Sequence, residues 1–266
     1  MTILARVQQL ELHLTGDAAA ITAAQRLRYR VFYEELGAVP TAGMDATRMD
    51  ADRFDALADH LVVVDRARST GWQPEVVGCY RLLREAVACR HGGFYSAGEF
   101  DLTPVRAGGG QMMELGRSCV APGYRNGAVM QLLWRGIAAY VEQHGVGLML
   151  GCASLPGTDP EAVAPALSFL HHHALAPLGL RPRALPEHHV RTDRLPLAEL
   201  DCRAALKLLP PLLKAYLRMG GTIGDGAVID RQFNTIDVCL VLPTEKIRAD
   251  YRRHYRQPYQ PLDAAA

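Results

Sequence analysis

The strongest constraint on the fold lies in the middle of the chain, where a glycine-bearing turn joins two unlike segments. The run 112–120 is mostly apolar and predicts a strand, and residues 127–143 carry apolar side chains at helical spacing. Gly145 ends this helix, and the apolar run 146–155 predicts a second buried strand. A strand, a helix and a strand in succession form a crossover that places the two strands parallel. The sequence therefore predicts an α/β fold.

The other segments predict further strands and helices around this unit. Alternating or β-branched runs predict strands at "QLELHL", "HLVVVD", "EVVGCYRLL" and "TIDVCLVLP", and turn residues between the second and third predict a hairpin. Helices are expected after Asp17 and at "PPLLKAYLRMGG". No linker separates two halves of the 266 residues. We therefore expect one domain over 1–250 that ends in a C-terminal helical extension, then a basic, frayed tail over 251–266.

Composition and cysteine usage argue against several classes of protein. The net charge of +1 gives no bulk attraction to nucleic acid. The six cysteines form no C-x-x-C pair and no cluster with histidine at zinc spacing, so we expect reduced thiols, no metal site and a cytoplasmic location. Charged and amide side chains interrupt the N-terminal segment, and no apolar run approaches the roughly 18 residues of a spanning helix. Neither a signal peptide nor a membrane anchor is predicted.

The turn "YRNGAV" is a candidate phosphate site. The N–H groups at the start of a helix lack intrahelical partners and carry partial positive charge, which suits an anion. Arg125 adds a cation, while Gly127 and Ala128 allow a ligand to approach the backbone. The alternative is an ordinary strand-to-helix turn that needs glycine only for its own conformation.

Glu114 and Arg117 precede this turn on the predicted strand. Side chains three residues apart on a strand point to opposite faces unless a β-bulge intervenes. A bulge would bring both side chains into one site and would expose backbone N–H groups able to hold an oxyanion or an amide-bearing ligand. The alternative for Glu114 is a simple salt bridge to a neighbouring arginine.

Seven charged and aromatic positions together resemble a known pattern. Their order and spacing match the acyl-homoserine lactone synthases: Arg28 and Phe32 in "RYRVF", Asp52 and Asp55 in "DRFD", Arg81 in "GCYRLL", and Glu114 and Arg117 in "ELGR". Other stretches, among them "LRYRVFYEELGA" and "SFLHHHALAP", resemble the ornithine N-acyltransferases, the lyso-ornithine lipid synthases of the same GNAT superfamily. The tryptophan that the lactone synthases carry six residues after Phe32 is Ala38 here, which favours the acyltransferases.

The resemblance implies both a fold and a reaction. The fold would be a GNAT-like mixed central sheet flanked by helices. The reaction would move a 3-hydroxyacyl chain from the phosphopantetheine thioester of acyl carrier protein to the α-amino group of L-ornithine, the first step of ornithine lipid synthesis. The acyl-phosphopantetheine thioester would be a co-substrate, and no cofactor would be bound permanently.

The resemblance and the chemistry together assign candidate residues. Glu114 is expected to accept the proton of the acceptor amine, directly or through water, and Ser154 to protonate the leaving thiolate. Backbone N–H groups between Gly116 and Cys119 are expected to hold the oxyanion. The phosphopantetheine arm is expected to contact Cys119, Val120, Arg125, Asn126, Gly127 and Ala128. The substrate-binding candidates are Arg28, Phe32, Asp52, Asp55, Arg81 and Arg117.

The charged substrate-binding candidates are expected to form an ionic cluster, for which three interpretations are available. The cluster organises the N-terminal flap over the acyl pocket, or its aspartates bind the cationic acceptor, or it is a solvated surface network. For the carboxylate of the acceptor, Arg81 and Arg117 are the candidate partners, because arginine pairs with carboxylates in a bidentate geometry.

Three other functions are alternatives to this interpretation. An acyl-homoserine lactone synthase would use the same carrier protein with S-adenosylmethionine, and an N-acyl amino acid synthase would use another acceptor. A hemolysin-like membrane-active protein would need a long amphipathic or spanning segment, which the sequence does not contain. Because the expected product is amphiphilic, transient contact with the inner membrane face is a further expectation, to which the arginines of the tail would contribute.

Overall fold

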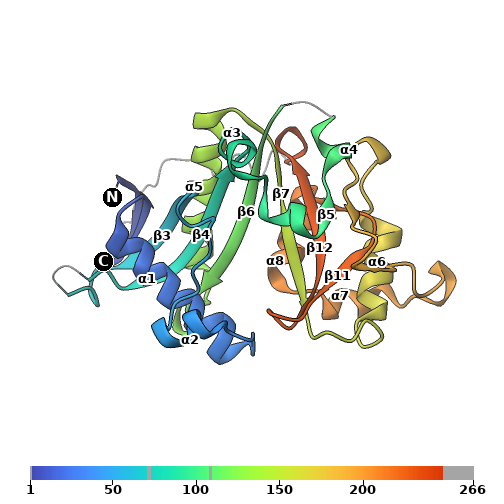
Figure 1. Ribbon diagram of the computed structural model, residues 1–266, viewed down its shortest axis with the longest axis horizontal. Coiled ribbons are helices and arrows are strands. Elements are labelled where there is room, and N and C mark those ends of the chain that lie inside the picture. The colour runs from blue at the N-terminus through green and yellow to red at the C-terminus, as the bar shows by residue number, and fades with distance from the viewer. Residues whose placement is uncertain (1, 71–72, 108–109, 248–266) are drawn as a thin grey trace, which may run out of the picture.

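The computed structural model describes residues 2–70, 73–107 and 110–247 (Figure 1). Ten strands of these ranges form one sheet in the order β1-β2-β3-β4-β6-β7-β12-β11-β9, with β10 also paired to β12. Their bounds are β1 (Thr2–Val7), β2 (Leu10–Thr15), β3 (Asp59–Asp65), β4 (Val76–Arg84), β6 (Gln111–Val120), β7 (Val146–Pro156), β9 (His189–Val190), β10 (Thr222–Ile223), β11 (Ala227–Asp230) and β12 (Thr235–Pro243). A separate pair consists of β5 (Phe100–Asp101) and β8 (Arg183–Ala184).

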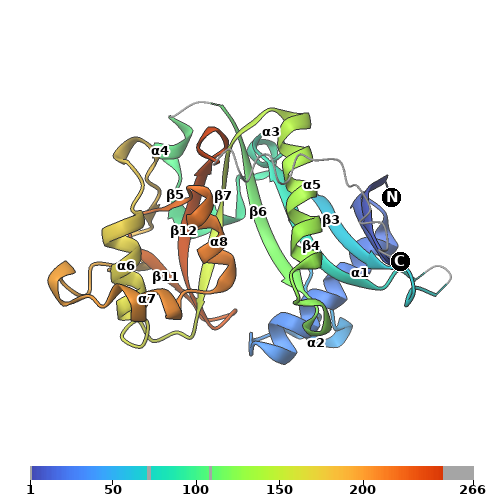
Figure 2. The same cartoon turned by 180° about the vertical axis from the view of Figure 1, so that it is seen from behind.

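Helices cover both faces of the large sheet. Figure 1 shows α1 and α3 on one face, and Figure 2 shows α5 and α8 on the other. The α-helices are α1 (Ala18–Tyr29), α2 (Ala42–Thr47), α3 (Glu85–Ala88), α4 (Thr103–Arg106), α5 (Ala128–His144), α6 (Ala164–Ala174), α7 (Cys202–Leu208) and α8 (Pro211–Met219). Two other helical turns matter for the site, the π-helical η1 (Arg30–Glu35) and the 3₁₀ turn η3 (Tyr95–Gly98). Within the described ranges, no helix has the length and apolarity needed to cross a bilayer.

The central crossover has the form that the sequence predicts. Strand β6 leads through the turn into α5, and α5 leads into β7, which pairs with β6 in parallel. Gly127 precedes α5 with a φ of 99° and Gly145 ends it with a φ of 60°, both in the left-handed region that favours glycine. The apolar face of α5 is buried against the sheet, including Leu133, Ile137 and Tyr140. The parallel strands and the α/β class are therefore confirmed.

The sheet opens in its middle. The pairing of β6 with β7 ends at Glu114 and Leu150, although β6 continues to Val120 and β7 to Pro156. Beyond this point the two strands diverge, as the lower half of Figure 1 shows. At the start of the divergence, a Cβ atom on Gly151 would lie 2.3 Å from the carbonyl oxygen of Leu115, so this close approach requires glycine. Glycine at this position therefore lets the two backbones stay close at the point where the gap begins.

The outer elements also follow the predictions closely. Strands β3 and β4 form the expected antiparallel hairpin, and the last predicted strand and helix correspond to β12 and α8. The helix expected after Asp17 is α1, whose first turn is capped by the Asp17 side chain, and it continues into η1. The predicted basic tail, 251–266, lies outside the described residues.

Candidate active site

A cavity of about 490 Å³ occupies the gap between β6 and β7. From the first half of the chain, residues 114–118 of β6 and Phe32 of η1 line it. From the second half, Cys152 of β7 and Asp237 of β12 line it, and residues 210–213 at the start of α8 add an apolar surface. A concave site with apolar walls and a few convergent charges is the usual form of a small-molecule pocket.

A β-bulge brings Glu114 and Arg117 into this cavity together. On β6, Arg117 and Ser118 lie opposite the single residue Tyr80 of β4. Arg117 has a φ of 52°, in the left-handed region. The extra residue reverses the alternation of side chains, so that Glu114 and Arg117 both line the cavity. The spacing of the two residues is thus compatible with one site only because of this bulge.

The carboxylate of Glu114 is buried, with 5% of the residue exposed, and is held by η3. It accepts hydrogen bonds from the N–H groups of Tyr95 and Ser96 at 2.8 and 2.7 Å, and from the Ser96 hydroxyl at 2.5 Å. Burial raises the pKa of Glu114, while the hydrogen bonds from Ser96 and Tyr95 oppose the shift. A carboxylate with a raised pKa, facing a cavity, has the properties of a general base.

Three arginines and three aspartates form a connected ionic network beside Glu114. We call this set the arginine–aspartate network; its members are Arg28, Arg81, Arg117, Asp50, Asp52 and Asp55. Its formal charges cancel, so it adds no net charge to the cavity. Five of the six are substrate-binding candidates from the sequence, and the sixth, Asp50, is new.

The centre of the network is buried. Arg28 donates to both carboxylate oxygens of Asp55 at 2.9 and 2.7 Å and pairs with Asp50 at 2.8 Å. Exposure is 1% for Arg28 and 0% for Asp50, so the interpretation as a solvated surface network is wrong. Burial alone would raise the pKa of Asp55, but the hydrogen bonds and charge of Arg28 outweigh it and hold this pKa well below its usual range.

The side of the network that faces the cavity is formed by two arginines. Arg81 donates to Asp52 at 2.6 Å, and Arg117 donates to Asp50 and Asp52, each at 3.0 Å. Arg81 and Arg117 line the cavity, whereas the described lining includes none of the network's aspartates. This geometry favours bracing of the arginines over direct binding of an acceptor by Asp52 and Asp55, whose roles stay predictions.

Aromatic rings enclose the Arg117 guanidinium. Its central carbon lies 4.6 Å from the ring centre of Phe233 and 5.0 Å from that of Tyr95. Phe32 packs edge-on against Phe233, with ring centres 5.8 Å apart. Cation–π contacts of this kind fix the orientation of an arginine in addition to its ion pairs. Phe32 therefore belongs to the cavity wall, as the sequence pattern suggests.

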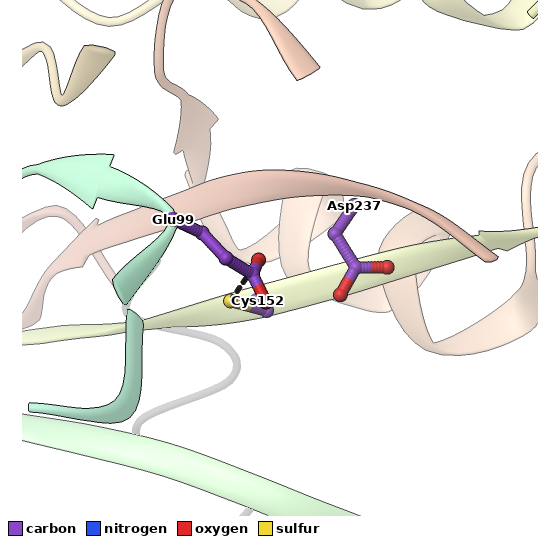
Figure 3. A group of neighbouring side chains, drawn as sticks. All are labelled: Glu99, Cys152 and Asp237. Carbon is purple, nitrogen blue, oxygen red and sulfur yellow. Dashed lines mark hydrogen bonds between the residues drawn. The ribbon is translucent and has the colours of Figure 1, made fainter. Parts of the chain in front are cut away.

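The opposite side of the cavity carries acidic side chains that form no ion pair with an arginine within the described ranges. We call Glu99, Asp230 and Asp237 the acidic wall. Asp230 and Asp237 line the cavity directly, and Glu99 lies behind Cys152, whose sulfur is 3.4 Å from a carboxylate oxygen of Glu99. Figure 3 shows Glu99 and Asp237 reaching toward β7 from two different segments. One ligand atom from each of Glu99, Cys152 and Asp237 lies within 4.8 Å of the other two.

Burial and mutual repulsion change the ionisation of this wall. Burial raises the pKa of Glu99 to about 8, and the charge of Asp237 adds to the shift. Burial also raises the pKa of Asp237 to about 6, although hydrogen bonds from Thr235 and Ser154 oppose the shift. Ser154, the candidate proton donor, lines the cavity and lies opposite Asp237 in the β7–β12 pairing. Its role in catalysis stays a prediction.

Comparisons with known proteins agree with this geometry. The acetyltransferase (GNAT) domain family matches residues 27–135. An L-ornithine N(α)-acyltransferase of Rhodobacter capsulatus is 48% identical over 245 residues, covering 92% of this chain and 94% of that protein. One from Brucella abortus is 45% identical over 255 residues, covering 95% and 91%. The chain belongs to the L-ornithine N(α)-acyltransferase family.

A comparison with a solved structure supports the fold of this acyltransferase and nothing beyond the fold. FeeM, an N-acyl amino acid synthase from uncultured soil microbes, superposes with a TM-score of 0.50 at 10% identity, covering 89% of this chain and 91% of that one. The mixed sheet flanked by helices is therefore the GNAT-like architecture expected from the sequence.

The expected phosphopantetheine contacts of the acyltransferase lie at the end of β6 and in the turn beyond it. Arg125 forms a bidentate pair with Glu35 at 2.6 and 2.8 Å, and its Nε donates to the carbonyl of Val120. The Asn126 side chain accepts from the N–H of Ala128, and Gly127 begins the helix. On β6 the described lining of the cavity ends at Ser118, just before Cys119. These residues adjoin the cavity without lining it, and their contact with phosphopantetheine stays a prediction.

The sequence patterns do not predict several residues of the acyltransferase site. Asp237 carries a visible signal, because it is the single charged residue in the strand "TIDVCLVLP", and a charge in an apolar strand is rarely buried without a role. Asp50 is one of five aspartates between 45 and 59, and nothing in that run distinguishes it. Glu99 and Ser96 come from a loop-rich segment with no local signal. Only the tertiary structure places them beside Glu114.

Proposed function

We propose that this protein transfers a 3-hydroxyacyl chain from acyl carrier protein to the α-amino group of L-ornithine, the first step of ornithine lipid synthesis. The observation that supports the acceptor is the likeness, over nearly the whole of both chains, to proteins named L-ornithine N(α)-acyltransferase. The cavity supports transfer to an amine, because it combines an apolar surface at 210–213 with a buried carboxylate. The alternatives, a lactone synthase or a synthase with another acceptor, lack such relatives at comparable identity among those compared.

In the proposed mechanism, Glu114 accepts a proton from the α-ammonium group, directly or through a water molecule. The free amine attacks the thioester carbonyl, forming a carbon–nitrogen bond and a tetrahedral oxyanion. Backbone N–H groups of the bulge around Arg117 and Ser118 stabilise this oxyanion. The carbon–sulfur bond then breaks, and the proton that the attacking nitrogen must lose passes through the Ser154 hydroxyl to the leaving thiolate, while Glu114 returns its own proton to solvent. No covalent enzyme intermediate is needed, so neither Cys119 nor Cys152 acts as a nucleophile.

The proposed donor is a thioester on the phosphopantetheine arm of acyl carrier protein. The arm would reach the cavity along the end of β6, and its phosphate would lie at the start of α5, where helix N–H groups favour an anion. Acyl carrier protein is acidic, so docking should weaken as salt rises, because the Debye length falls to about 3 Å at 1 M. Equal efficiency with a coenzyme A thioester and no effect of salt would argue against a carrier protein as donor.

Mass spectrometry of lipids from cells that express the protein would test the reaction. An N-acylated ornithine, absent from cells that carry the Glu114→Gln variant, is the expected result. A diffusible lactone would indicate the synthase alternative, and an acylated amino acid of another kind would redefine the acceptor. The same spectra would give the length and hydroxylation of the acyl chain.

We also propose a cytoplasmic protein that touches the inner membrane face transiently when it releases its amphiphilic product. The basic tail that would contribute lies outside the described residues. Flotation with vesicles of neutral and anionic lipid would test the contact, and equal lack of binding to both would contradict it.

A further inference from the structure

The charge of the cavity is unbalanced on one side. In the described lining the cationic side chains are Arg81 and Arg117, and both are paired with aspartates of the arginine–aspartate network. Glu114, Asp230 and Asp237 remain as acidic lining residues outside that network. Ornithine carries two ammonium groups and one carboxylate. One of the ammonium groups must lose its proton to Glu114 before it reacts, which leaves the side-chain ammonium to be matched by a carboxylate.

We propose that Asp237, together with Asp230, binds the side-chain ammonium of the acceptor and thereby selects ornithine over neutral amino acids. The proposal rests on the acyl transfer to ornithine proposed above. It assigns acceptor choice to the acidic wall rather than to Asp52 and Asp55.

The positions of the two aspartates suit one ammonium group. On the antiparallel strands β11 and β12, Asp230 is paired with Thr235, and Asp237 lies two residues beyond Thr235. They are therefore diagonal neighbours on the same face of the sheet, with Cα atoms roughly 7–8 Å apart. An ammonium group has three N–H donors and can bridge two carboxylates at that spacing.

Both carboxylates are held in place. Asp237 is 4% exposed, and one of its oxygens accepts from the Thr235 hydroxyl at 2.8 Å. Asp230 accepts from the N–H of Phe233 at 2.9 Å. A carboxylate fixed by a neighbour needs little reorganisation when it meets a cation, and a buried one gains more from the pairing than an exposed one. Asp237 is therefore the principal residue of the two.

The path from Glu114 to Asp237 is short enough for a small diamine. Glu114 accepts from the Ser96 hydroxyl at 2.5 Å, and the Cys152 sulfur lies 3.4 Å from that hydroxyl. Asp237 in turn has a carboxylate oxygen within 4.8 Å of the Cys152 sulfur. The two amines of ornithine are separated by the α-carbon and three methylene groups, a chain that can therefore place one amine near Glu114 and the other near Asp237.

Two other assignments fit less well. Asp52 and Asp55 accept from Arg28, Arg81 and Arg117, so a bound ammonium would compete with guanidinium groups that are already in place. A divalent metal at Glu99, Cys152 and Asp237 would require deprotonated ligands. Burial raises the pKa of the Cys152 thiol well above its ordinary value, so a metal would have to displace its proton. An organic cation does not need that proton removed.

The test compares two acceptors that differ only in the side-chain amine. The catalytic efficiency, kcat/KM, is measured for ornithine and for norvaline with the same acyl donor, in the wild type and in Asp237→Asn, Asp230→Asn and Asp55→Asn. In Asp237→Asn, kcat/KM for ornithine should fall about 10- to 100-fold more than kcat/KM for norvaline, which is the range for one charge-assisted hydrogen bond. Asp230→Asn should show the same preference with a smaller ratio. Asp55→Asn should reduce kcat/KM for both acceptors by the same factor.

A binding measurement complements the kinetics and does not depend on turnover. In thermal denaturation without donor, ornithine should raise the Tm of the wild type but not of Asp237→Asn, and norvaline should raise neither. Equal kinetic losses for both acceptors in Asp237→Asn and Asp230→Asn would overturn the proposal, as would discrimination lost only in Asp55→Asn. Stabilisation by Zn²⁺ or Mn²⁺ that ornithine cannot displace would assign the acidic wall to a metal and also overturn it. A wild type that acylates neither acceptor would instead refute the proposed function.

Discussion

The two sides of the cavity use the same kind of residue in opposite electrostatic states. Asp55, in the arginine–aspartate network, receives both ends of the Arg28 guanidinium, and its pKa is held well below the usual range despite burial. Asp237, in the acidic wall, is also buried, but its pKa is raised to about 6. The charge of a buried aspartate is already neutralised when arginines pair with it. A buried aspartate without such an ion pair can bind a cation that enters from the solvent. Both aspartates are buried, so the difference between their pKa values comes from the groups that surround each carboxylate.

The largest effect is expected at Glu114, where the two sides meet. The Glu114→Gln variant keeps the shape of the side chain but removes the basic oxygen, so turnover should fall by about 10²–10⁴-fold. The measurement is the initial rate at pH 7, with folding checked by circular dichroism. Glu187→Gln, at an exposed position away from the cavity, serves as the matched control. Near wild-type turnover in folded Glu114→Gln would remove Glu114 from the role of base.

The same substitution on the two sides should change stability in different ways. Asp50→Asn leaves Arg28 and Arg117 buried with one carboxylate fewer, which should cost about 3–5 kcal/mol and lower the Tm on the order of 10 °C. Asp237→Asn removes a charge that forms no ion pair among the described residues and should leave the Tm at pH 7 nearly unchanged or slightly higher. Thermal denaturation of both variants in one buffer gives the comparison. Equal losses would mean that the acidic wall is as tightly paired as the network.

Discrimination between ornithine and norvaline should depend on pH. Asp237 is ionised above its pKa of about 6, so ammonium binding is available there and is lost as the pH falls through 6. The ratio of kcat/KM for ornithine over norvaline should drop by about tenfold from pH 7 to pH 5. Glu99, Asp230, Ser154 and Arg117 also face Asp237 and shape this titration. Because Glu114 serves both acceptors, the ratio removes its contribution, and a constant ratio would contradict the assignment.

The smallest expected effect concerns Glu99. Its pKa is raised from 4.5 to about 8, so between these values the folded protein binds a proton that the unfolded chain releases. Stability is therefore lost as the pH rises through this window. Glu99→Gln mimics the protonated form and should raise the Tm at pH 8 by a few °C, with little difference at pH 4.5. A Tm difference that does not change with pH would indicate that Glu99 is already ionised without cost.

The sequence predicts features that depend on neighbouring residues better than contacts between residues that are far apart in the chain. The crossover, the hairpin and the helices were predictable, because each depends on local periodicity and turn residues. Glu114 and Arg117 were predictable as a pair through their spacing, which required the bulge that β6 contains. The contact of Glu99 with Cys152 and the proximity of Asp237 were not, because these residues are far apart in the chain and only the folded sheet brings them together. The sequence shows Asp237 as a lone charge in an apolar strand, but it does not show that Glu99 and Cys152 lie beside it.

The opening of the sheet between β6 and β7 also lies between the segment that matches the GNAT domain family and the β11–β12 hairpin. The segment that matches the GNAT domain family, 27–135, contains Glu114 and the whole arginine–aspartate network, while Asp230 and Asp237 lie about a hundred residues later in the β11–β12 hairpin. In the proposed mechanism, the proton acceptor and the residues that select the acceptor therefore lie in different stretches of the chain. A graft of that hairpin from a relative that acylates another amino acid can change the head group of the product while every residue that handles the thioester stays in place.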